Sequence, residues 1–313
     1  MKDSMNDKLV TLIGGGGFLG RYIAQTLLQA GARVRVAQRD PRQAFFLKPL
    51  GGLGQTQFVA ADVLRPDTIR RAVHGASAVV NLVGTFGANQ QRIHVDGART
   101  IAEAATDEGA ALVHISAIGA QADGDSEYAR SKGEGENAVR SFAPHATILR
   151  PSTVFGREDQ FINRFAGMIA TLPIVPVLRP EARFQPVYVG DVARAVAAAL
   201  IDEERFGGRA FELGGPEVLT MMELHQRIAR LIGRKERFLP LPDAAGGLLA
   251  ALPGTPISRD QWKMLGHDSV VSNGAEGLDA LDVERTPIDS VAPGWLVRYR
   301  KAGRFSLIER AGG

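Results

Sequence analysis

The sequence contains no cysteine at all. This absence excludes disulfide bonds, thiolate metal ligands and cysteine nucleophiles. The six histidines do not occur at the short spacings of metal ligands, so no metal site is expected. The formal net charge is only +3, and the basic residues are dispersed along the chain. This balance argues against a nucleic-acid-binding protein.

Long apolar runs are also missing. No stretch approaches the length needed to span a bilayer, and the polar start MKDSMND lacks the apolar core of a signal peptide. The sequence therefore predicts a cytoplasmic protein without a transmembrane segment. Ala244–Leu252 is apolar but short. Core packing is favoured for it over partner docking or a shallow membrane contact.

The strongest pattern in the chain is a glycine-rich stretch near its start. Residues 9–13 form a short apolar run, typical of a buried strand, and a segment with helical periodicity continues to Ala30. Gly14, Gly17 and Gly20 have the spacing of a dinucleotide-binding turn between strand and helix. Gly14 allows the sharp turn, Gly17 lets the backbone approach a pyrophosphate at the helix N-terminus, and Gly20 permits close packing.

Strands and helices alternate through the first half of the chain. Apolar runs predict further strands at residues 32–37, 57–61, 78–84, 111–115 and 147–149. This alternation predicts an α/β fold with a Rossmann-type, doubly wound parallel sheet. Residues 1–156 are expected to form the dinucleotide-binding core, with some later segments returning to it. Residues 157–313 are expected to form mainly a smaller C-terminal lobe for a substrate or partner.

The end of the second expected strand bears on the choice of nucleotide. NAD-selective folds usually place an acidic residue there to hold the ribose 2′-hydroxyl, whereas this chain has Ala37 or Gln38 followed by Arg39. A guanidinium pairs with a 2′-phosphate through charge-assisted hydrogen bonds. The sequence therefore favours NADP(H) over NAD(H). Arg42 is a weaker second candidate for binding the 2′-phosphate, and the nearby Asp40 leaves NAD(H) as an alternative.

Tyr128 and Lys132 are four residues apart and are expected on one face of a helix that ends near Phe142. A neighbouring ammonium group stabilises a phenolate and lowers the tyrosine pKa from its usual value of about 10. Such a tyrosine can exchange a proton with a carbonyl or alcohol while hydride moves to or from nicotinamide. An ordinary surface pair is the alternative interpretation.

Aspartate and threonine mark three expected helix starts. Asp62 either contacts the adenine edge or caps the helix that begins shortly after it. The segment 184–193 is predicted to begin as a strand that ends at the N-cap of a helix, Asp191. Thr220 and Glu223 fit a capping box.

Together these motifs resemble those of extended or atypical short-chain dehydrogenase/reductases. The resemblance covers about residues 8–300 and includes the segments 62–63, 150–156 and 185–193. More narrowly, the chain is similar to the NAD(P)H-binding accessory subunits of respiratory complex I and their bacterial relatives. The segments that carry this narrower resemblance are 80–84, 94–98, 114–117, 211–216 and 257–261.

The resemblance implies roles for individual residues. Tyr128 would be the catalytic acid/base, Lys132 would hold the nicotinamide ribose, and Ser116 matches the first serine of the usual catalytic pair. The residues implied to bind the nucleotide are Gly14, Gly17, Phe18, Leu19, Gly20, Arg39, Asp62, Val63, Leu82, Val83, Gly84, Ser116, Tyr128, Lys132, Pro151 and Ser152.

One hydroxyl position departs from the superfamily pattern. The serine that normally polarises the substrate carbonyl corresponds to Ala117 or Ile118, and Ser126 could substitute for it. The departure favours a structural NADP(H) in a protein resembling a complex I accessory or assembly subunit, peripheral at the inner face of a respiratory membrane. The alternative is a free-standing NADPH-dependent oxidoreductase or epimerase/dehydratase. Through Tyr128 and Lys132, it would act on a small carbonyl, sugar-nucleotide or quinone/isoprenoid-like substrate.

Overall fold

The computed structural model describes residues 5–87, 89–235, 237–251 and 258–301. The chain divides into two compact units. Unit 1 comprises Met1–Pro151, Val189–Leu213 and Ser272–Glu284, and unit 2 comprises Ser152–Tyr188, Gly214–Val271 and Arg285–Gly313. Within the described ranges, no helix combines the length and the apolar character needed to cross a bilayer.

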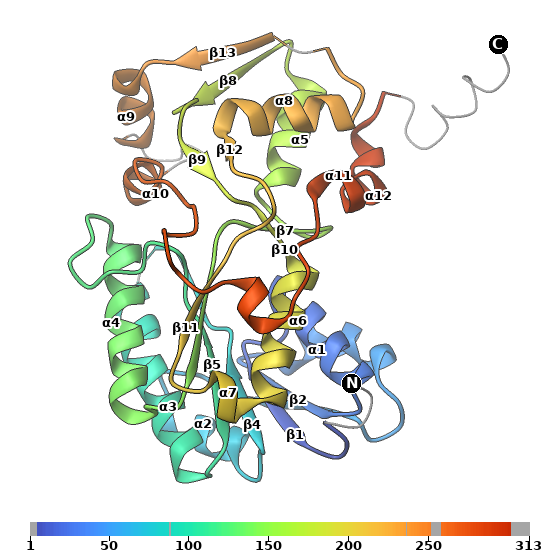
Figure 1. Cartoon of the computed structure of the whole chain (residues 1–313), viewed down its shortest axis with the longest axis vertical. Helices are drawn as coiled ribbons and strands as arrows, with labels where there is room; N and C mark the ends of the chain where they lie inside the picture. Colours follow the sequence, from blue (N-terminus) through green and yellow to red (C-terminus); the bar gives the residue numbers. More distant parts are fainter. Residues whose placement is uncertain (1–4, 88, 236, 252–257, 302–313) are drawn as a thin grey trace, which may run out of the picture. The chain divides into compact units, whose positions relative to one another are not determined.

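Unit 1 is built on a seven-stranded parallel sheet in the order β11-β6-β5-β4-β1-β2-β3 (Figure 1). The interior strand β1 pairs with both β2 and β4, so the strand order reverses beside it. Such a reversal is where open α/β sheets bind their ligands. The predicted Rossmann-type sheet is therefore confirmed. The strands are β1 Leu9–Ile13, β2 Arg33–Gln38, β3 Thr56–Ala60, β4 Ala78–Asn81, β5 Ala111–Ile115, β6 Thr147–Pro151 and β11 Ala210–Leu213.

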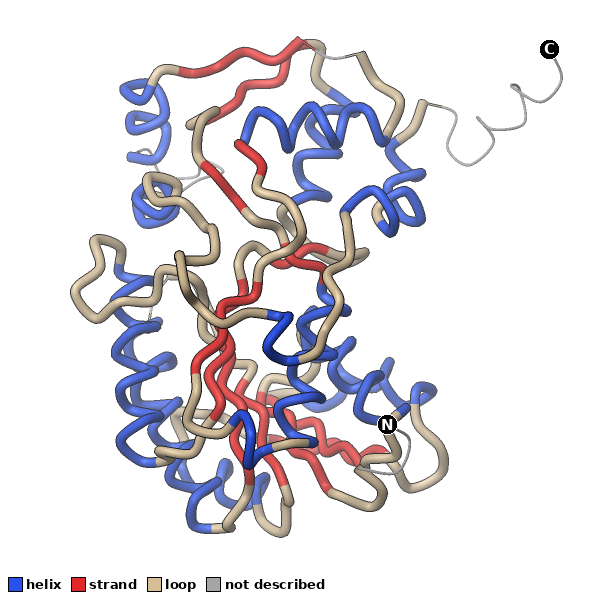
Figure 2. The backbone as a smooth tube through the Cα atoms, in the orientation of Figure 1, coloured by secondary structure: helices blue, strands red, loops and turns tan. Residues whose placement is uncertain are grey.

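Helices pack in two groups around this sheet (Figure 2). One group contains α1 and α6, which pack against each other, and in the other α3 packs against both α2 and α4. Buried aliphatic side chains from sheet and helices, including Ile13, Ile69, Ile101 and Val139, form a continuous core. The helices are α1 Phe18–Gln29, η1 Pro41–Leu50, α2 Pro66–Val73, η2 Arg92–Asp96, α3 Gly97–Asp107, α4 Glu127–Phe142, α6 Val189–Ile201, α7 Glu203–Phe206 and η3 Leu278–Leu281.

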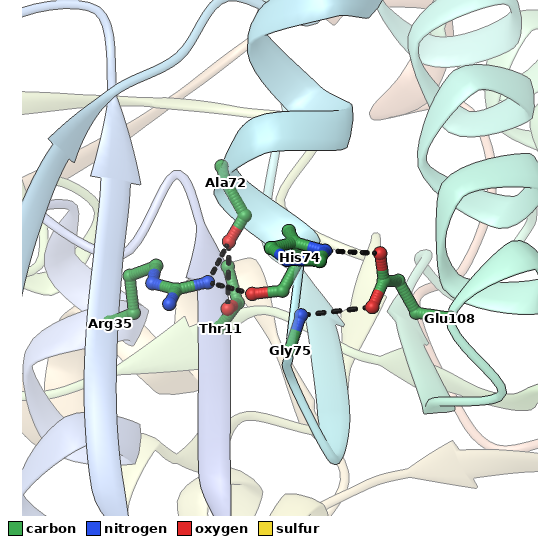
Figure 3. A network of polar contacts seen from close by, with 6 residues as sticks. All are labelled: Thr11, Arg35, Ala72, His74, Gly75 and Glu108. Carbon is green, nitrogen blue, oxygen red and sulfur yellow. Dashed lines mark hydrogen bonds and ion pairs between the residues drawn. The ribbon is translucent and has the colours of Figure 1, made fainter.

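A polar network ties the end of α2 to the sheet and to the end of α3 (Figure 3). From β2, Arg35 donates to the carbonyl oxygens of Ala72 (2.7 Å) and His74 (2.8 Å). The Thr11 hydroxyl on β1 also donates to Ala72 (3.1 Å), and Glu108 contacts the His74 ring nitrogen Nδ1 at 2.9 Å. The bonds from Arg35 and Thr11 satisfy carbonyl groups that the last turn of a helix leaves unpaired.

Unit 2 has small sheets packed on helices. Its core joins α5, α8 and α12 through buried residues such as Ile162, Leu224, Ile228 and Leu296. Strand β10 pairs with β7, β12 with β9, and β13 with β8. The strands are β7 Val154–Phe155, β8 Ile174–Leu178, β9 Arg183–Phe184, β10 Val187–Tyr188, β12 Leu219–Thr220 and β13 Arg237–Leu241. The helices are α5 Ile162–Thr171, α8 Met221–Leu231, α9 Asp243–Ala251, α10 Arg259–Met264, α11 Ile288–Val291, α12 Pro293–Leu296 and η4 Val297–Tyr299.

Two sequence predictions in this region need correction. The strand expected from residue 184 up to Asp191 is divided into β9 and β10, which lie in different sheets, because Gln185 and Pro186 interrupt it. Helix α6 begins at Val189, so Asp191 lies within its first turn and is not the N-cap. Buried there, the Asp191 carboxylate accepts a 2.6 Å hydrogen bond from Arg194.

Candidate functional site

The glycine turn lies between β1 and α1. Gly14 has a φ of +82°, and a Cβ added to it would lie 3.3 Å from the Val83 side chain and 3.4 Å from the Leu82 carbonyl carbon. Gly17 is the N-cap of α1, and no side chain within the described ranges caps this helix. A Cβ at Gly17 would meet only the Gly14 carbonyl oxygen, at 3.5 Å. The turn therefore combines open space with helix amides that side chains leave available, which fits a pyrophosphate.

The helix side of this turn is closely packed. Phe18 and Leu19 lie half-buried in the first turn of α1, where Phe18 meets Tyr22 edge-on at 5.9 Å between ring centroids. Gly20 is buried, and a Cβ there would lie 2.6 Å from the backbone carbonyl carbon of Gly15. The absence of a side chain at Gly20 therefore allows α1 to pack against the turn.

The end of β2 brings the polar side chain of Gln38 beside the turn, and three charged residues follow it. The Gln38 amide nitrogen donates to the Asp40 carbonyl oxygen (2.7 Å), and its Cδ lies 2.7 Å from where a Gly16 Cβ would be. Arg42 forms two hydrogen bonds to the Asp40 carboxylate, of 2.9 and 3.0 Å, and this pairing lowers the pKa of Asp40. Arg39 is exposed, and among the described residues none pairs with it. Its guanidinium is thus available to a ligand, whereas that of Arg42 is engaged.

Asp62 and Val63 follow β3 and shape the entry into α2. The Asp62 carboxylate accepts a hydrogen bond from the Leu64 amide (3.0 Å), and the N-cap of α2 is Arg65. The expectation that Asp62 caps this helix is therefore wrong, because the chain makes an extra turn before α2 begins. Val63 packs against Gly97, where an added Cβ would come within 3.0 Å of it.

Helix α4 carries both residues of the Tyr128 and Lys132 pair, as predicted. The Ser126 hydroxyl is its N-cap and accepts from the Ala129 amide (3.0 Å). The Lys132 ammonium donates to the Ile115 carbonyl oxygen at the end of β5 (3.1 Å). A Cβ at Gly84 would lie 3.6 Å from the same nitrogen, so the structure brings Gly84 and Lys132 together. Burial lowers the pKa of Lys132 to about 8.

Tyr128 lies among aromatic rings. Its ring stacks on Phe86 (4.4 Å between centroids, 17° between planes) and meets the His94 ring edge-on at 5.6 Å. Burial raises the pKa of Tyr128 to about 12. This shift is opposite to the lowering expected from a neighbouring lysine, because the phenol is desolvated and the Lys132 ammonium donates to backbone.

His94 connects the loop after β4 to α4, and sequence reasoning did not single it out. Its Nε2 accepts from the Thr85 amide (3.0 Å), so Nδ1 carries the proton and donates to the Ser131 hydroxyl (2.8 Å). Ser131 in turn donates to the Tyr128 carbonyl oxygen (3.1 Å). Burial lowers the pKa of His94 to about 3, so the ring is neutral near pH 7. The only sequence signal was its place in segment 94–98 of the family resemblance.

A hydroxyl group without a partner lies at the end of β5. The Ser116 Oγ is buried and makes no hydrogen bond to the part of the chain that the structure describes. Nearby, the His114 Nδ1 accepts from the Asn81 side-chain amide (3.0 Å), and burial lowers the pKa of His114 to about 3. A buried hydroxyl at the carboxyl end of a parallel strand fits a polar ligand that would supply the missing hydrogen bond.

The last two predicted residues belong to different units. Pro151 ends β6 in unit 1, and its carbonyl oxygen accepts from the Ile118 amide (3.1 Å), beside the loop that follows Ser116. Ser152 begins unit 2, where its hydroxyl donates to the Ser269 carbonyl oxygen (2.6 Å). The residues that the structure gathers around the ends of β1, β4 and β5 therefore all lie in unit 1.

Known proteins share the sequence pattern and the fold of this chain. A profile of the NAD dependent epimerase/dehydratase family covers residues 10–214. The chain belongs to this family. Its members bind NAD(P), in agreement with the open glycine turn. The solved structure of epimerase Mth375 from Methanothermobacter thermautotrophicus has the same fold, with a TM-score of 0.74 at 18% identity, over 98% of this chain and 96% of that one.

Two relatives are similar over most of the chain. It is 32% identical to the protein named NADH dehydrogenase [ubiquinone] 1 alpha subcomplex subunit 9, mitochondrial, of Arabidopsis thaliana, over 96% of this chain and 80% of that protein. It is also 31% identical to a protein of Caulobacter vibrioides named ceramide reductase, over 89% of this chain and 86% of that protein. Within this family, the chain therefore has homologues that are complex I subunits and a homologue named as an enzyme.

Proposed function

We propose that this chain binds NADP(H) in unit 1 as a structural ligand and serves as an accessory or assembly subunit of a membrane-associated respiratory complex. The state of the proton-transfer residues carries this proposal. Tyr128 is half-buried with a raised pKa, and the Lys132 ammonium donates to backbone. No hydroxyl is present at Ala117 or Ile118, and Ser126 is used as a helix cap. A nucleotide bound there stabilises the folded chain without needing to react.

Similarity to the Arabidopsis complex I subunit supports the proposed partner. The similarity extends over 96% of the chain and thus includes most of unit 2 as well as the nucleotide-binding fold. The proposed partner is therefore a respiratory complex. No described helix of this chain is able to span a membrane. This arrangement would place the protein at the periphery of the inner face of the respiratory membrane.

Arg39→Ala tests the choice of NADP(H) over NAD(H). The exposed guanidinium would pair with the 2′-phosphate, so we expect NADPH affinity to fall by roughly 10- to 100-fold, the value of a charge-assisted hydrogen bond. NADH affinity should change by no more than about twofold. Calorimetric titration of both nucleotides measures this, with exposed Arg70→Ala on α2 as the control. Equal losses for both nucleotides would contradict the assignment.

The second candidate function is an NADPH-dependent reductase or an epimerase/dehydratase. The observation that favours it is the similarity to the protein named ceramide reductase, together with the retained Tyr128 and Lys132 on one helix. In this reaction nicotinamide would supply hydride, and Tyr128 would supply the proton to a carbonyl of a quinone, isoprenoid-like or sugar-nucleotide substrate.

Tyr128→Phe separates the two functions. We expect purified protein to retain NADPH through gel filtration and to leave it unoxidised against a panel of carbonyls and quinones. Tyr128→Phe should retain the nucleotide equally well, because the substitution removes only the hydroxyl. Absorbance at the nicotinamide band and mass spectrometry of the released nucleotide measure both properties. Turnover that falls by about 100-fold or more in the variant would instead establish the reductase.

A further inference from the structure

Unit 2 contains a two-stranded parallel ribbon with two unlike faces. In the pairing of β8 with β13, Val175, Val177 and Phe238 are directed to the core, where the Phe238 ring meets His225 of α8 at 6.0 Å. Figure 1 shows the two strands side by side with α8 next to them. Because side chains alternate along a strand, the other face carries the facing pairs Ile174 with Arg237, Pro176 with Leu239, and Leu178 with Leu241.

Aliphatic side chains are unusually exposed on this outer face. Ile174 is 49% exposed and Leu239 51%, and Leu172, which precedes β8, is 40% exposed. At the Leu178 end, the ribbon contacts α9, on which Leu248 is 65% exposed. We call the three exposed residues on and just before the strands the ribbon face: Leu172, Ile174 and Leu239. Grouped exposed aliphatic residues mark interaction surfaces more often than single ones do.

Positive charge accompanies the ribbon face. Residues 230–237, from the end of α8 to the first residue of β13, contain four basic residues and one acidic residue. Of these, Arg230, Lys235 and Arg237 are exposed, and Arg237 lies opposite Ile174 on the ribbon. The excess extends to the whole of unit 2, which has 17 Lys and Arg against 11 Asp and Glu, whereas unit 1 has 20 against 23. A partner of negative charge therefore fits unit 2.

We propose that the ribbon face, together with Lys235 and Arg237, binds the surface of an anionic phospholipid bilayer. The aliphatic side chains would enter the boundary between headgroups and acyl chains, while the cations meet lipid phosphates. A nucleic acid or an acidic protein would match the charge but leaves the three exposed aliphatic residues of the ribbon face unexplained. A second copy of the chain would cover the aliphatic residues but not complement the positive charge. The inference concerns unit 2 alone and does not depend on the nucleotide proposed for unit 1.

Vesicle flotation with the full chain tests this surface. We expect binding to vesicles made of equal parts phosphatidylcholine and phosphatidylglycerol, weak binding to phosphatidylcholine alone, and release by salt. Lys235→Gln combined with Arg237→Gln should weaken binding about 30-fold, since each cation near such a surface contributes roughly fivefold. Ile174→Ser combined with Leu239→Ser should weaken it about tenfold or more.

Matched variants of unit 1 serve as controls. Arg65→Gln with Arg70→Gln removes two exposed charges, and Leu53→Ser removes an exposed leucine, so both should bind within about twofold of the wild type. NADPH affinity measured in every preparation reports separately on unit 1, and circular dichroism reports folding. Absence of binding to anionic vesicles overturns the proposal, as does equal loss in control and ribbon-face variants. Binding to heparin alone, or dimerisation through the ribbon face without vesicle binding, overturns it as well.

Discussion

Gly17→Val is expected to abolish nucleotide binding while leaving the fold intact. In the structure, a Cβ at this position meets only the Gly14 carbonyl oxygen, at the ordinary contact distance of 3.5 Å, and the backbone is extended at a negative φ of −79°. The protein therefore accommodates the side chain, at a cost of about 1 kcal/mol for a poorer N-cap. The same side chain occupies the space through which a pyrophosphate reaches the amides of α1. We expect NADPH affinity to fall about 1000-fold or more, because both steric access and the helix-end interaction are lost.

Gly20→Ala provides the contrasting control. Its Cβ would lie 2.6 Å from the Gly15 carbonyl carbon, so α1 has to move away from the turn, and we expect a loss of about 2–3 kcal/mol in the free energy of unfolding. Urea unfolding and calorimetric NADPH titration of both variants separate the two effects. Gly17→Val with normal affinity would remove the basis for the nucleotide site. Equal destabilisation in the two variants would show that Gly17 has a packing role only.

The parallel sheet could be predicted because local patterns agree with the tertiary arrangement. Strand β1 is a short apolar run that is buried in a central position, and glycines follow it where the chain turns into α1. The capping box of Thr220 and Glu223 was also predictable and is present at the start of α8, since both of its hydrogen bonds form within one turn. Features that depend on residues close together in the sequence can therefore be predicted from it.

Features that depend on contacts between residues far apart in the sequence could not be predicted from it. Asp191 has the residue type of an N-cap, but pairing of β10 with β7 ends at Tyr188 and the helix starts directly after it. The spacing of Tyr128 and Lys132 placed them on one helix, yet it contained no information on Phe86, which comes from the loop after β4. That ring stacks on the Tyr128 ring, and burial is the cause of the raised pKa, so the direction of the tyrosine pKa shift required the fold.

The position of α4 also depends on Gly135 and Glu136, which no motif identified. A Cβ at Gly135 would overlap the carbonyl oxygen of His94, so this glycine lets α4 pack directly on the π-helical segment η2. One turn from Lys132, Glu136 is almost fully buried and anchors α4 to the sheet through Arg150 of β6. From the sequence alone, the buried Glu136 cannot be distinguished from a solvent-facing glutamate, because the helix around it is polar. The ion pair of Glu136 with Arg150 could be recognised only in the structure, which places β6 beside α4.

Arg150→Met is expected to destabilise the protein by about 3–4 kcal/mol, because it leaves a buried carboxylate without its main partner. Arg150 donates to both oxygens of Glu136, at 2.8 and 2.6 Å, and its third nitrogen lies 3.7 Å from Glu212 on β11. The side chain of Glu136 is only 3% exposed, so water cannot replace the guanidinium. Since the pair joins α4 to β6, NADPH affinity should fall as well through displacement of Lys132.

Arg140→Met is the matched control, because Arg140 also approaches Glu136, at 3.7 Å, but from an exposed position. We expect its loss to change the free energy of unfolding by no more than about 0.5 kcal/mol. Adding Glu136→Gln to Arg150→Met removes the stranded charge and should recover more than half of the deficit. Urea unfolding of the four proteins at neutral pH measures these differences. Similar losses for Arg140→Met and Arg150→Met, or no recovery in the double variant, would show that charge burial does not hold α4 against the sheet.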